Sequence, residues 1–283
     1  VYSTDIAVER RISNDITVTV SYLNSRGRNL PYFRDVNFGA ANSTVNYVLE
    51  GGGVLGSFPL YRGTRPNASF GRTTVMESTV STDYNALVLE ARKRFSRGLL
   101  YSVNYTLAKS KDNGQTSTTF FSSNQSYDGP TARTNDVDNV MNPSNSDRRH
   151  RFVASFHYQP EYLWGIGVGG ILTLESGLPL TQRISGSLPG AFGSTVSSST
   201  NGTGGSSVVP WAGFNGERQT GRKTFDIRAA KEFNIGGTAK AQVLWEVFNL
   251  FNTVNYATFG ETAFDVVTAA STYDAAANVG TVT

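Results

Sequence analysis

The sequence lacks features that would place it in several common protein classes. It contains no cysteine, which excludes disulfide bonds and thiolate metal sites. It contains no run of about 18 apolar residues, so a membrane-spanning helix is not predicted. Charged residues make up only 17% of the chain and leave a net charge of +3. This small excess gives no reason to expect a nucleic acid as a partner.

What the sequence does contain is a series of long runs in which apolar and polar residues alternate. A period of two places apolar side chains on one side of a β-strand and polar side chains on the other. The runs form pairs, and a short link joins the two members of each pair. The paired runs are Tyr2–Ile12 with Ile16–Asn24, Tyr84–Phe95 with Leu99–Lys109, Arg149–Tyr158 with Gly165–Glu175, and Thr224–Phe233 with Thr238–Leu250.

The connections between these runs are short and long in turn. Outer-membrane β-barrels show this rhythm, because their periplasmic turns are short and their extracellular loops are long. We therefore predict an all-β, antiparallel, up-and-down transmembrane β-barrel domain in the bacterial outer membrane. The short links are Ser13–Asp15, Ser96–Gly98, Gln159–Trp164 and Asn234–Gly237, and the long polar stretches are Ser25–Asp83, Ser110–Arg148 and Ser176–Lys223.

A soluble antiparallel sandwich would alternate in the same way. The runs here are about 9–13 residues long, whereas soluble strands are most often about 5–6 residues long. A sandwich also has no reason to gather its long loops at one end. In the barrel, the apolar side chains face the lipid and the charged ones face the lumen. The outward set is expected to include Leu87, Leu89, Val103, Tyr105, Val243 and Trp245, and the lumen set Glu90, Arg92, Arg228, Lys240 and Glu246.

An ordered set of short motifs lies on and beside the long runs: Tyr84–Leu87, Arg92–Leu99, Tyr105–Ser110, Asp147–Phe152, Leu172–Thr181 and Glu246–Asn252, followed by Asn255 and Tyr256. This set resembles the late barrel of TonB-dependent outer-membrane receptors. Their order and spacing are similar to those of the large, Oar-like receptors that carry an N-terminal carboxypeptidase-regulatory-like domain. The resemblance implies a barrel of about 22 strands, a plug domain in its lumen, and energy coupling through a periplasmic TonB box.

Against that family, residues 1–283 are interpreted as a partial outer-membrane β-barrel domain of about eight strands. The sequence contains no plug domain, no TonB box and no final strand that ends in an aromatic residue. If the tight turns are periplasmic, both chain ends are expected on the extracellular side. A complete bacterial barrel has both ends in the periplasm, so we expect further strands before Val1 and after Thr283.

Two functions are compatible with this interpretation. The first is part of a TonB-dependent receptor that binds a ligand at the cell surface and moves it into the periplasm. The alternative is a structural or interaction protein, a surface barrel whose long loops bind a partner, polymer or matrix. An enzyme is not expected, because no Ser-His-Asp order and no G-x-S-x-G motif are present. The expected partners are outer-membrane lipid, an extracellular ligand and, through N-terminal parts outside this sequence, the TonB complex.

The candidate ligand-binding residues lie in the first long stretch, where aromatic and cationic groups are mixed. Exposed loops often carry function, although a long loop also packs on its own aromatic side chains. The candidates are Tyr32, Arg34, Tyr61, Arg62 and Arg65.

No cofactor or metal site is predicted. His150 and His157 are seven positions apart on one run and therefore face opposite sides. We expect His150 at the membrane interface and His157 in the lumen. The acidic segment 135–147 offers the oxygen ligands that calcium takes, but it lacks the D-x-D-x-D-G spacing of a calcium loop. A solvated loop is the alternative for that segment.

Overall fold

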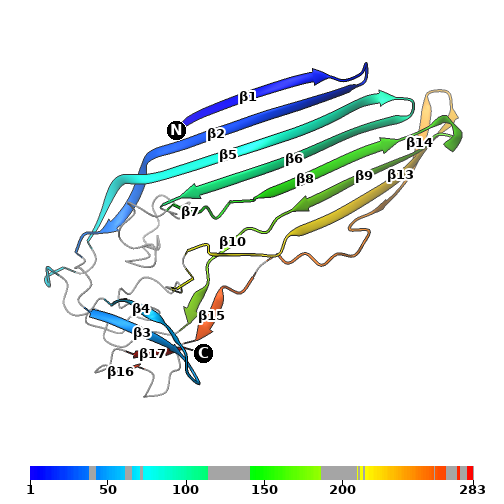
Figure 1. Cartoon of the computed structure of the whole chain (residues 1–283). Coiled ribbons are helices and arrows are strands. Elements are labelled where there is room, and N and C mark those ends of the chain that lie inside the picture. The colour runs from blue at the N-terminus through cyan, green and yellow to red at the C-terminus, as the bar shows by residue number, and fades with distance from the viewer. Residues whose placement is uncertain are drawn as a thin grey trace.

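The principal element of the fold is one long, single-layered antiparallel sheet (Figure 1). The computed structural model describes residues 1–37, 43–60, 66–70, 73–113, 141–185, 209, 211–212, 214–257, 259–265, 273–274 and 279–282. In these residues the helical structure is one short 3-10 turn, η1 (Glu161–Leu163). No described helix is long and apolar enough to cross a membrane, a finding that does not bear on crossing by strands.

The eight long strands follow one another in the sheet in chain order, apart from the short strands between them. Each pairs with its neighbour in an antiparallel register. The predicted up-and-down arrangement is therefore confirmed. The strands are β1 (Tyr2–Arg11), β2 (Ile16–Asp35), β5 (Thr74–Ser96), β6 (Leu99–Asp112), β8 (His150–Tyr158), β9 (Ile166–Glu175), β13 (Arg222–Gly236) and β14 (Ala239–Val247).

The predicted tight turns are also confirmed, and the backbone angles in them account for the glycines at these positions. Arg97 and Gly98 both have positive φ, at 50° and 75°, as does Gly237 at 58°. Glycine accepts this conformation without steric cost. Neighbouring turns are bonded to each other, since Arg94 N donates to Asp15 O at 2.8 Å and Gln159 N donates to Gly98 O at 2.7 Å. The short-turn end of the sheet is therefore a laterally connected rim.

The stretch 25–83 is more regular than its polar composition predicted. Strand β2 continues to Asp35 and β5 already begins at Thr74, so the two form a ribbon beyond the rest of the sheet. The prediction of a loop from Ser25 to Asp83 was wrong for these residues. A register shift between Gly27 and Leu30 bends the ribbon there, where a Cβ on Gly27 would lie 2.5 Å from Thr82 Oγ1.

Short strands lie toward the end of the long sheet that carries the long connections, where β7 pairs with β6 in the long sheet and the others form small sheets (Figure 1). The N-terminus starts β1 from this loop side, as predicted for Val1, whereas Thr283 lies outside the described residues. The short strands are β3 (Ser43–Leu49), β4 (Val54–Leu60), β7 (Asn142–Pro143), β10 (Pro179–Leu180), β11 (Arg183–Ser185), β12 (Glu217–Arg218), β15 (Thr262–Asp265), β16 (Tyr273–Asp274) and β17 (Val279–Val282).

The strand registers establish which side chains share a face. Leu89 is paired with Tyr105 and Ala229 with Trp245, while Arg228 is paired with Glu246. Following the pairs across the sheet places the predicted outward set on one face and the predicted lumen set on the other. We call these the apolar face and the polar face.

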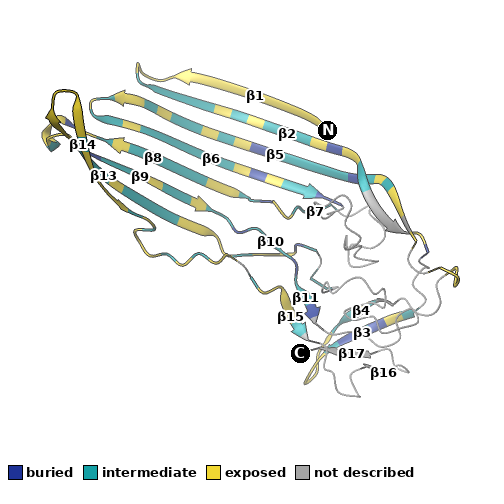
Figure 2. Ribbon diagram, turned by 180° about the vertical axis from the view of Figure 1, so that it is seen from behind, coloured by how far each residue is buried: buried dark blue, intermediate teal, exposed yellow. Residues whose placement is uncertain are grey.

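No described layer covers the apolar face. Val8 is 67% exposed, Val243 64% and Trp245 59%, values that a sandwich core would not allow. Every residue of β1 is exposed, on both faces of the strand (Figure 2). Strands β1 and β14 stand at the two ends of the strand order, so each pairs on one side only among the described strands. The sheet is an open part of a barrel wall.

Candidate functional site

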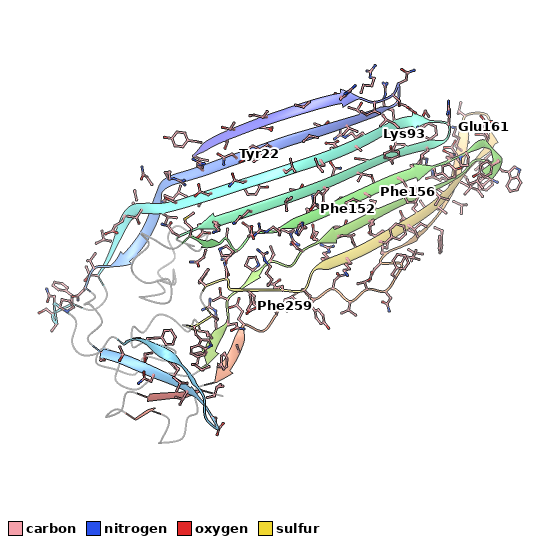
Figure 3. The ribbon with its side chains drawn as sticks, in the orientation of Figure 1. Tyr22, Lys93, Phe152, Phe156, Glu161 and Phe259 are labelled. Atoms are coloured by element: carbon pink, nitrogen blue, oxygen red, sulfur yellow. The ribbon has the colours of Figure 1, made fainter. Side chains whose placement is uncertain are left out.

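The central part of the apolar face is free of charge on every long strand. Its side chains are aliphatic, aromatic or small, and Figure 3 shows Phe152 and Phe156 of β8 among them. Charged residues on this face occur only toward its two ends. On β13, for example, Lys223 and Lys231 lie eight positions apart with Phe225, Ile227 and Ala229 between them on the same face. The face thus presents an apolar band bordered by cations.

The polar face carries ion pairs in place of the apolar band. Arg228 Nε lies 3.8 Å from Glu246 Oε1 across β13 and β14. Lys240 Nζ donates to Glu232 Oε1 at 2.7 Å. Arg92 and Glu90 are paired along β5. All of these side chains are partly exposed, so they form a hydrated, charged surface whose individual pairs contribute little to stability.

A concavity of about 360 Å³ lies mainly on the polar face between β8 and β14. Gly169 of β9 is paired with His157 on the polar face and contributes no side chain there, which leaves part of this space open. The concavity has an apolar floor and a charged rim. Its lining residues are Ser155, Phe156, Gly169, Gly170, Ile171, Asp226, Ile227, Arg228, Glu246 and Phe248.

On the loop side, Asp147 joins two connections that are distant in the sequence. Its carboxylate is 1% exposed, accepts a hydrogen bond from Ser110 N at 2.6 Å, and is paired with the Arg218 guanidinium. Arg218 Nη1 also donates to Asp147 O at 3.0 Å and to Gly177 O at 3.1 Å. Gly177 has no room for a side chain, since a Cβ would lie 1.7 Å from Gln219 O. These contacts fix the loop bases against each other.

Beside this pair, Glu175 holds two arginines at the end of β9. Arg148 Nη1 lies 2.9 Å from Glu175 Oε2, and Arg151 Nε lies 2.8 Å from Glu175 Oε1. The Glu175 side chain is only 10% exposed, so its carboxylate is better shielded from water than the other paired carboxylates of the polar face.

Asn215 adds a second joint between loop bases. Its backbone has a φ of 54°. Its Nδ2 donates to Pro143 O at 2.7 Å and to Asn145 Oδ1 at 2.8 Å, while its Oδ1 accepts from Thr181 Oγ1 at 2.9 Å. An asparagine with a left-handed backbone thus joins its own segment to two others, one with Pro143 and Asn145 and one with Thr181.

The asparagine-rich motif after β14 continues the sheet with side chains in place of backbone. Asn255 Oδ1 accepts from Lys223 N at 2.8 Å, and Asn255 Nδ2 donates to Lys223 O at 2.9 Å. Asn249 N donates to Asp226 Oδ1 at 2.7 Å, and Asn249 itself has a φ of 50°. The motif therefore covers the start of β13 with amide groups.

Farther out, three loop connections share one small hydrophobic core. Val45 and Tyr47 of β3 pack with Ile184 of β11 and Val209, and all four are fully or nearly fully buried. Burial raises the pKa of the Tyr47 hydroxyl above its usual value. The Trp211 ring lies 5.4 Å from the Tyr47 ring and 5.2 Å from the Phe264 ring. We call this core, with its partly buried neighbours Leu55, Phe58, Trp211, Ala212 and Phe264, the loop core.

At the opposite end, Lys93 binds the short turns, where Figure 3 places it. Its Nζ donates to Asp15 Oδ2 at 2.8 Å and to Ser96 O at 3.1 Å. Hydrogen bonds from Lys93, Ser13 and Ser96 hold the pKa of Asp15 well below its ordinary value of 3.8. Lys93 leaves the apolar face and reaches the rim, as long cationic side chains do at a membrane boundary.

The structure does not gather the predicted ligand-binding residues into one site. Tyr32 and Arg34 lie on β2, where they pair with Glu77 and Val75, and so belong to a strand and not to the predicted loop. Tyr61, Arg62 and Arg65 lie outside the described residues. The contacts that sequence reasoning missed are those of Asp147, Arg218 and the loop core. Asp147 stood in a predicted motif, but nothing in the sequence identifies Arg218 as its partner.

The histidines take the predicted opposite faces. His150 is on the apolar face, where its Nδ1 lies 2.8 Å from Tyr105 Oη, and His157 is on the polar face. Within the acidic segment, Asp147 is engaged by Arg218, whereas residues 135–140 lie outside the described part of the chain. Among the described residues, no group of three or more potential metal ligands converges.

The match to a protein family agrees with this architecture. The family described as "Outer membrane beta barrel domain" matches residues 1–283. Among solved structures, the chain is similar to the crystal structure of the outer membrane transporter YddB from Escherichia coli, at 8% sequence identity and a TM-score of 0.47. That match covers 89% of this chain and 28% of the length of the transporter. No curated protein matches the sequence.

Proposed function

We propose a transport function for this chain, which belongs to the outer membrane beta barrel domain family. In this proposal the eight long strands form part of the barrel wall of a TonB-dependent receptor. The receptor binds a ligand at the cell surface and moves it into the periplasm. The observation that carries the proposal is a two-faced wall, with an uncharged band on one side and ion pairs with a charged concavity on the other.

The dimensions of the apolar band support contact with lipid. Lys223 and Lys231 border it on β13 and lie eight positions apart. At about 3.4 Å per residue this separation is roughly 27 Å along the strand. A strand tilt of about 40° reduces it to roughly 20 Å across the membrane, close to the apolar band of about 25 Å in known outer-membrane barrels. The polar face then lines the barrel interior.

The open edges of the sheet support a larger barrel. Strands β1 and β14 do not pair with each other among the described strands. An unpaired backbone edge in hydrocarbon costs several kcal/mol for each unsatisfied group. We infer that further strands flank β1 and β14 in the membrane, as in the Oar-like receptors that the motifs resemble. A barrel of that size has room for a plug.

The loop core favours a second function, in which the barrel is a surface interaction protein. Long connections that fold around Tyr47, Ile184 and Trp211 present a shaped surface and not a set of separate loops. Such a surface binds a ligand for transport equally well as a partner for adhesion. Only the fate of the bound molecule separates the two functions.

A strain with an in-frame deletion of the gene separates them experimentally. The strain is grown with single nutrients from a panel of iron chelates, glycans, peptides and cobalamin, beside a strain without TonB. The transport proposal expects a growth defect on one nutrient that the strain without TonB shares. Unchanged growth on all nutrients, together with lost attachment to a surface or polymer, would instead establish the interaction function.

A further inference from the structure

The apolar face carries cations at two levels and almost no carboxylates. The relevant part of the eight long strands lies between the level of Asp83 and the short turns. In this part Asp83 is on the apolar face, and every other carboxylate projects from the polar face. The cations of the apolar face are Arg10, Lys93 and Lys231 on the turn side, and Arg26, Lys109, Lys111 and Lys223 on the loop side.

The turn-side lysines are already engaged by the protein. Lys93 is bound by Asp15 and by carbonyl groups of the β5–β6 turn. Lys231 Nζ lies 5.1 Å from the centre of the Phe233 ring, an arrangement in which the ring attracts the cation. These two side chains have protein partners and need none from the lipid.

The loop side is different, because two rows of polar side chains cross four strands there. The strand registers align Tyr2, Arg26, Asp83 and Lys111 in one row. The next row toward the membrane centre aligns Thr4, Asn24, Asn85 and Lys109. We call these eight residues the polar strip.

Hydrogen bonds order the middle of the polar strip. Asn24 Nδ2 donates to Asn85 Oδ1 at 2.7 Å, and Tyr22 Oη donates to the same oxygen at 2.8 Å. Figure 3 shows Tyr22 toward the loop side of β2. The side chains are therefore held in place before any ligand binds, which lowers the entropic cost of binding.

The charge of the polar strip is positive. Asp83 is its single carboxylate, and it is neutralised by Arg28 at 2.6 Å and by Arg26 at 3.8 Å. Lys109 and Lys111 face no carboxylate that the described residues place within ion-pair distance. The strip thus offers ammonium groups beside amide and hydroxyl groups, directly above the apolar side chains Ile6, Leu87 and Leu107.

We propose that the polar strip binds the phosphorylated sugar headgroup of a glycolipid in the outer leaflet. Lysine and arginine bind phosphate through charge-assisted hydrogen bonds, while Asn24, Asn85 and Thr4 bind sugar hydroxyls. The acyl chains lie on the apolar row formed by Ile6, Leu87 and Leu107. This inference rests on the orientation in the proposed function, with the long connections outside the cell.

The test uses the protein purified from outer membranes in detergent micelles, with binding measured by native mass spectrometry. The probes are bis-phosphorylated lipid A, dephosphorylated lipid A and phosphatidylglycerol. The double variant Lys109→Gln with Lys111→Gln is compared with the control Lys231→Gln with Lys240→Gln, which removes the same charge at the short-turn rim. We expect the strip variant to bind bis-phosphorylated lipid A roughly tenfold more weakly, and the control within about twofold of the parent protein.

Three results would overturn the proposal. Equal weakening by both double variants would show a general charge effect. If the protein bound dephosphorylated lipid A as tightly as bis-phosphorylated lipid A, the phosphate groups would not be recognised. If it bound phosphatidylglycerol equally tightly, the sugar would not be recognised. The outcome is independent of transport, because nutrient uptake is measured separately in the deletion strain. Failure of lipid binding leaves the uptake result intact, and loss of the uptake function leaves the lipid affinities intact.

Discussion

Asp147 and Arg218 form an ion pair across two loop bases, although they are 71 positions apart in the sequence. The carboxylate is buried, whereas the guanidinium is 35% exposed. The pair links the end of the β6–β8 connection to β12. It is one of the contacts that tie the loop side to the long sheet, together with those of Asn215 and Asn255.

Replacing Arg218 with glutamine leaves the buried Asp147 carboxylate without a cation. Removing one partner of a fully buried pair costs about 3–5 kcal/mol, and the partial exposure of Arg218 lowers this to about 2–4 kcal/mol. The free energy of unfolding in lipid vesicles measures the loss. The control Lys240→Gln breaks an exposed pair with Glu232 and should cost less than about 1 kcal/mol. Equal losses for the two variants would show that the buried pair has no special role.

Gly177→Ala tests the close packing behind this ion pair. The added Cβ meets Gln219 O at 1.7 Å, so one of the two segments has to move. We expect a loss of about 1–3 kcal/mol, as for other overpacked sites, and faster protease cleavage near 217–221. Gly260→Ala is the matched control, because a Cβ there meets no atom within 4 Å. A Gly177 variant as resistant to protease as the Gly260 variant would contradict the packing.

The Asp15–Lys93 contact predicts a pH dependence at the short-turn rim. The pKa of Asp15 is lower in the folded protein than its ordinary 3.8. Its contribution to stability is therefore complete above pH 3.8 and is lost as the pH falls toward the folded-state pKa. Asp15→Asn removes this part of the acid dependence. Parallel stability profiles for the parent and the variant below pH 4 would show that the contact does not couple to folding.

The loop core predicts a local effect of Trp211→Ala. Trp211 packs against Tyr47, Phe58 and Phe264. Because Trp211 is only partly buried, its truncation should cost less than the about 3–5 kcal/mol of a fully buried tryptophan. Because this cost falls on the loop core alone, protease should cut the long connections while the sheet stays intact by circular dichroism. Trp164→Ala, at a 79% exposed position, should leave cleavage unchanged. Equal cleavage of both variants would exclude the loop core as a folded unit.

The long strands were predictable because their evidence is local. The two-residue alternation of Tyr84–Phe95 and the turn residues Arg97 and Gly98 lie next to each other in the chain, and the structure places β5 and its turn there. The same two-residue alternation predicted which side chains share the apolar face and which share the polar face. A shift of one residue along a strand would exchange the two faces. The start of β5 at Thr74 was missed, because Thr74–Asp83 has a polar composition that also suits a loop.

The loop contacts were not predictable from a single sequence. Tyr47 lies in the connection between β2 and β5, whereas Ile184 and Trp211 lie in the distant connection between β9 and β13, and only the folded sheet brings them together. The same holds for Asn255, whose side chain replaces a backbone partner of Lys223. A motif containing Asn255 was visible, but its role depends on where β13 begins.

The most direct test of the account is the lipid accessibility of adjacent residues on one strand. The chain contains no cysteine, so a spin label on Trp245→Cys or Glu246→Cys is its only label. In vesicles containing the protein, collisions with oxygen report contact with lipid, and collisions with a water-soluble nickel chelate report contact with water. The two-faced wall predicts that the label at 245 is accessible to oxygen and the label at 246 to nickel. The reverse order, or nickel access at both positions, would contradict a membrane-facing apolar side.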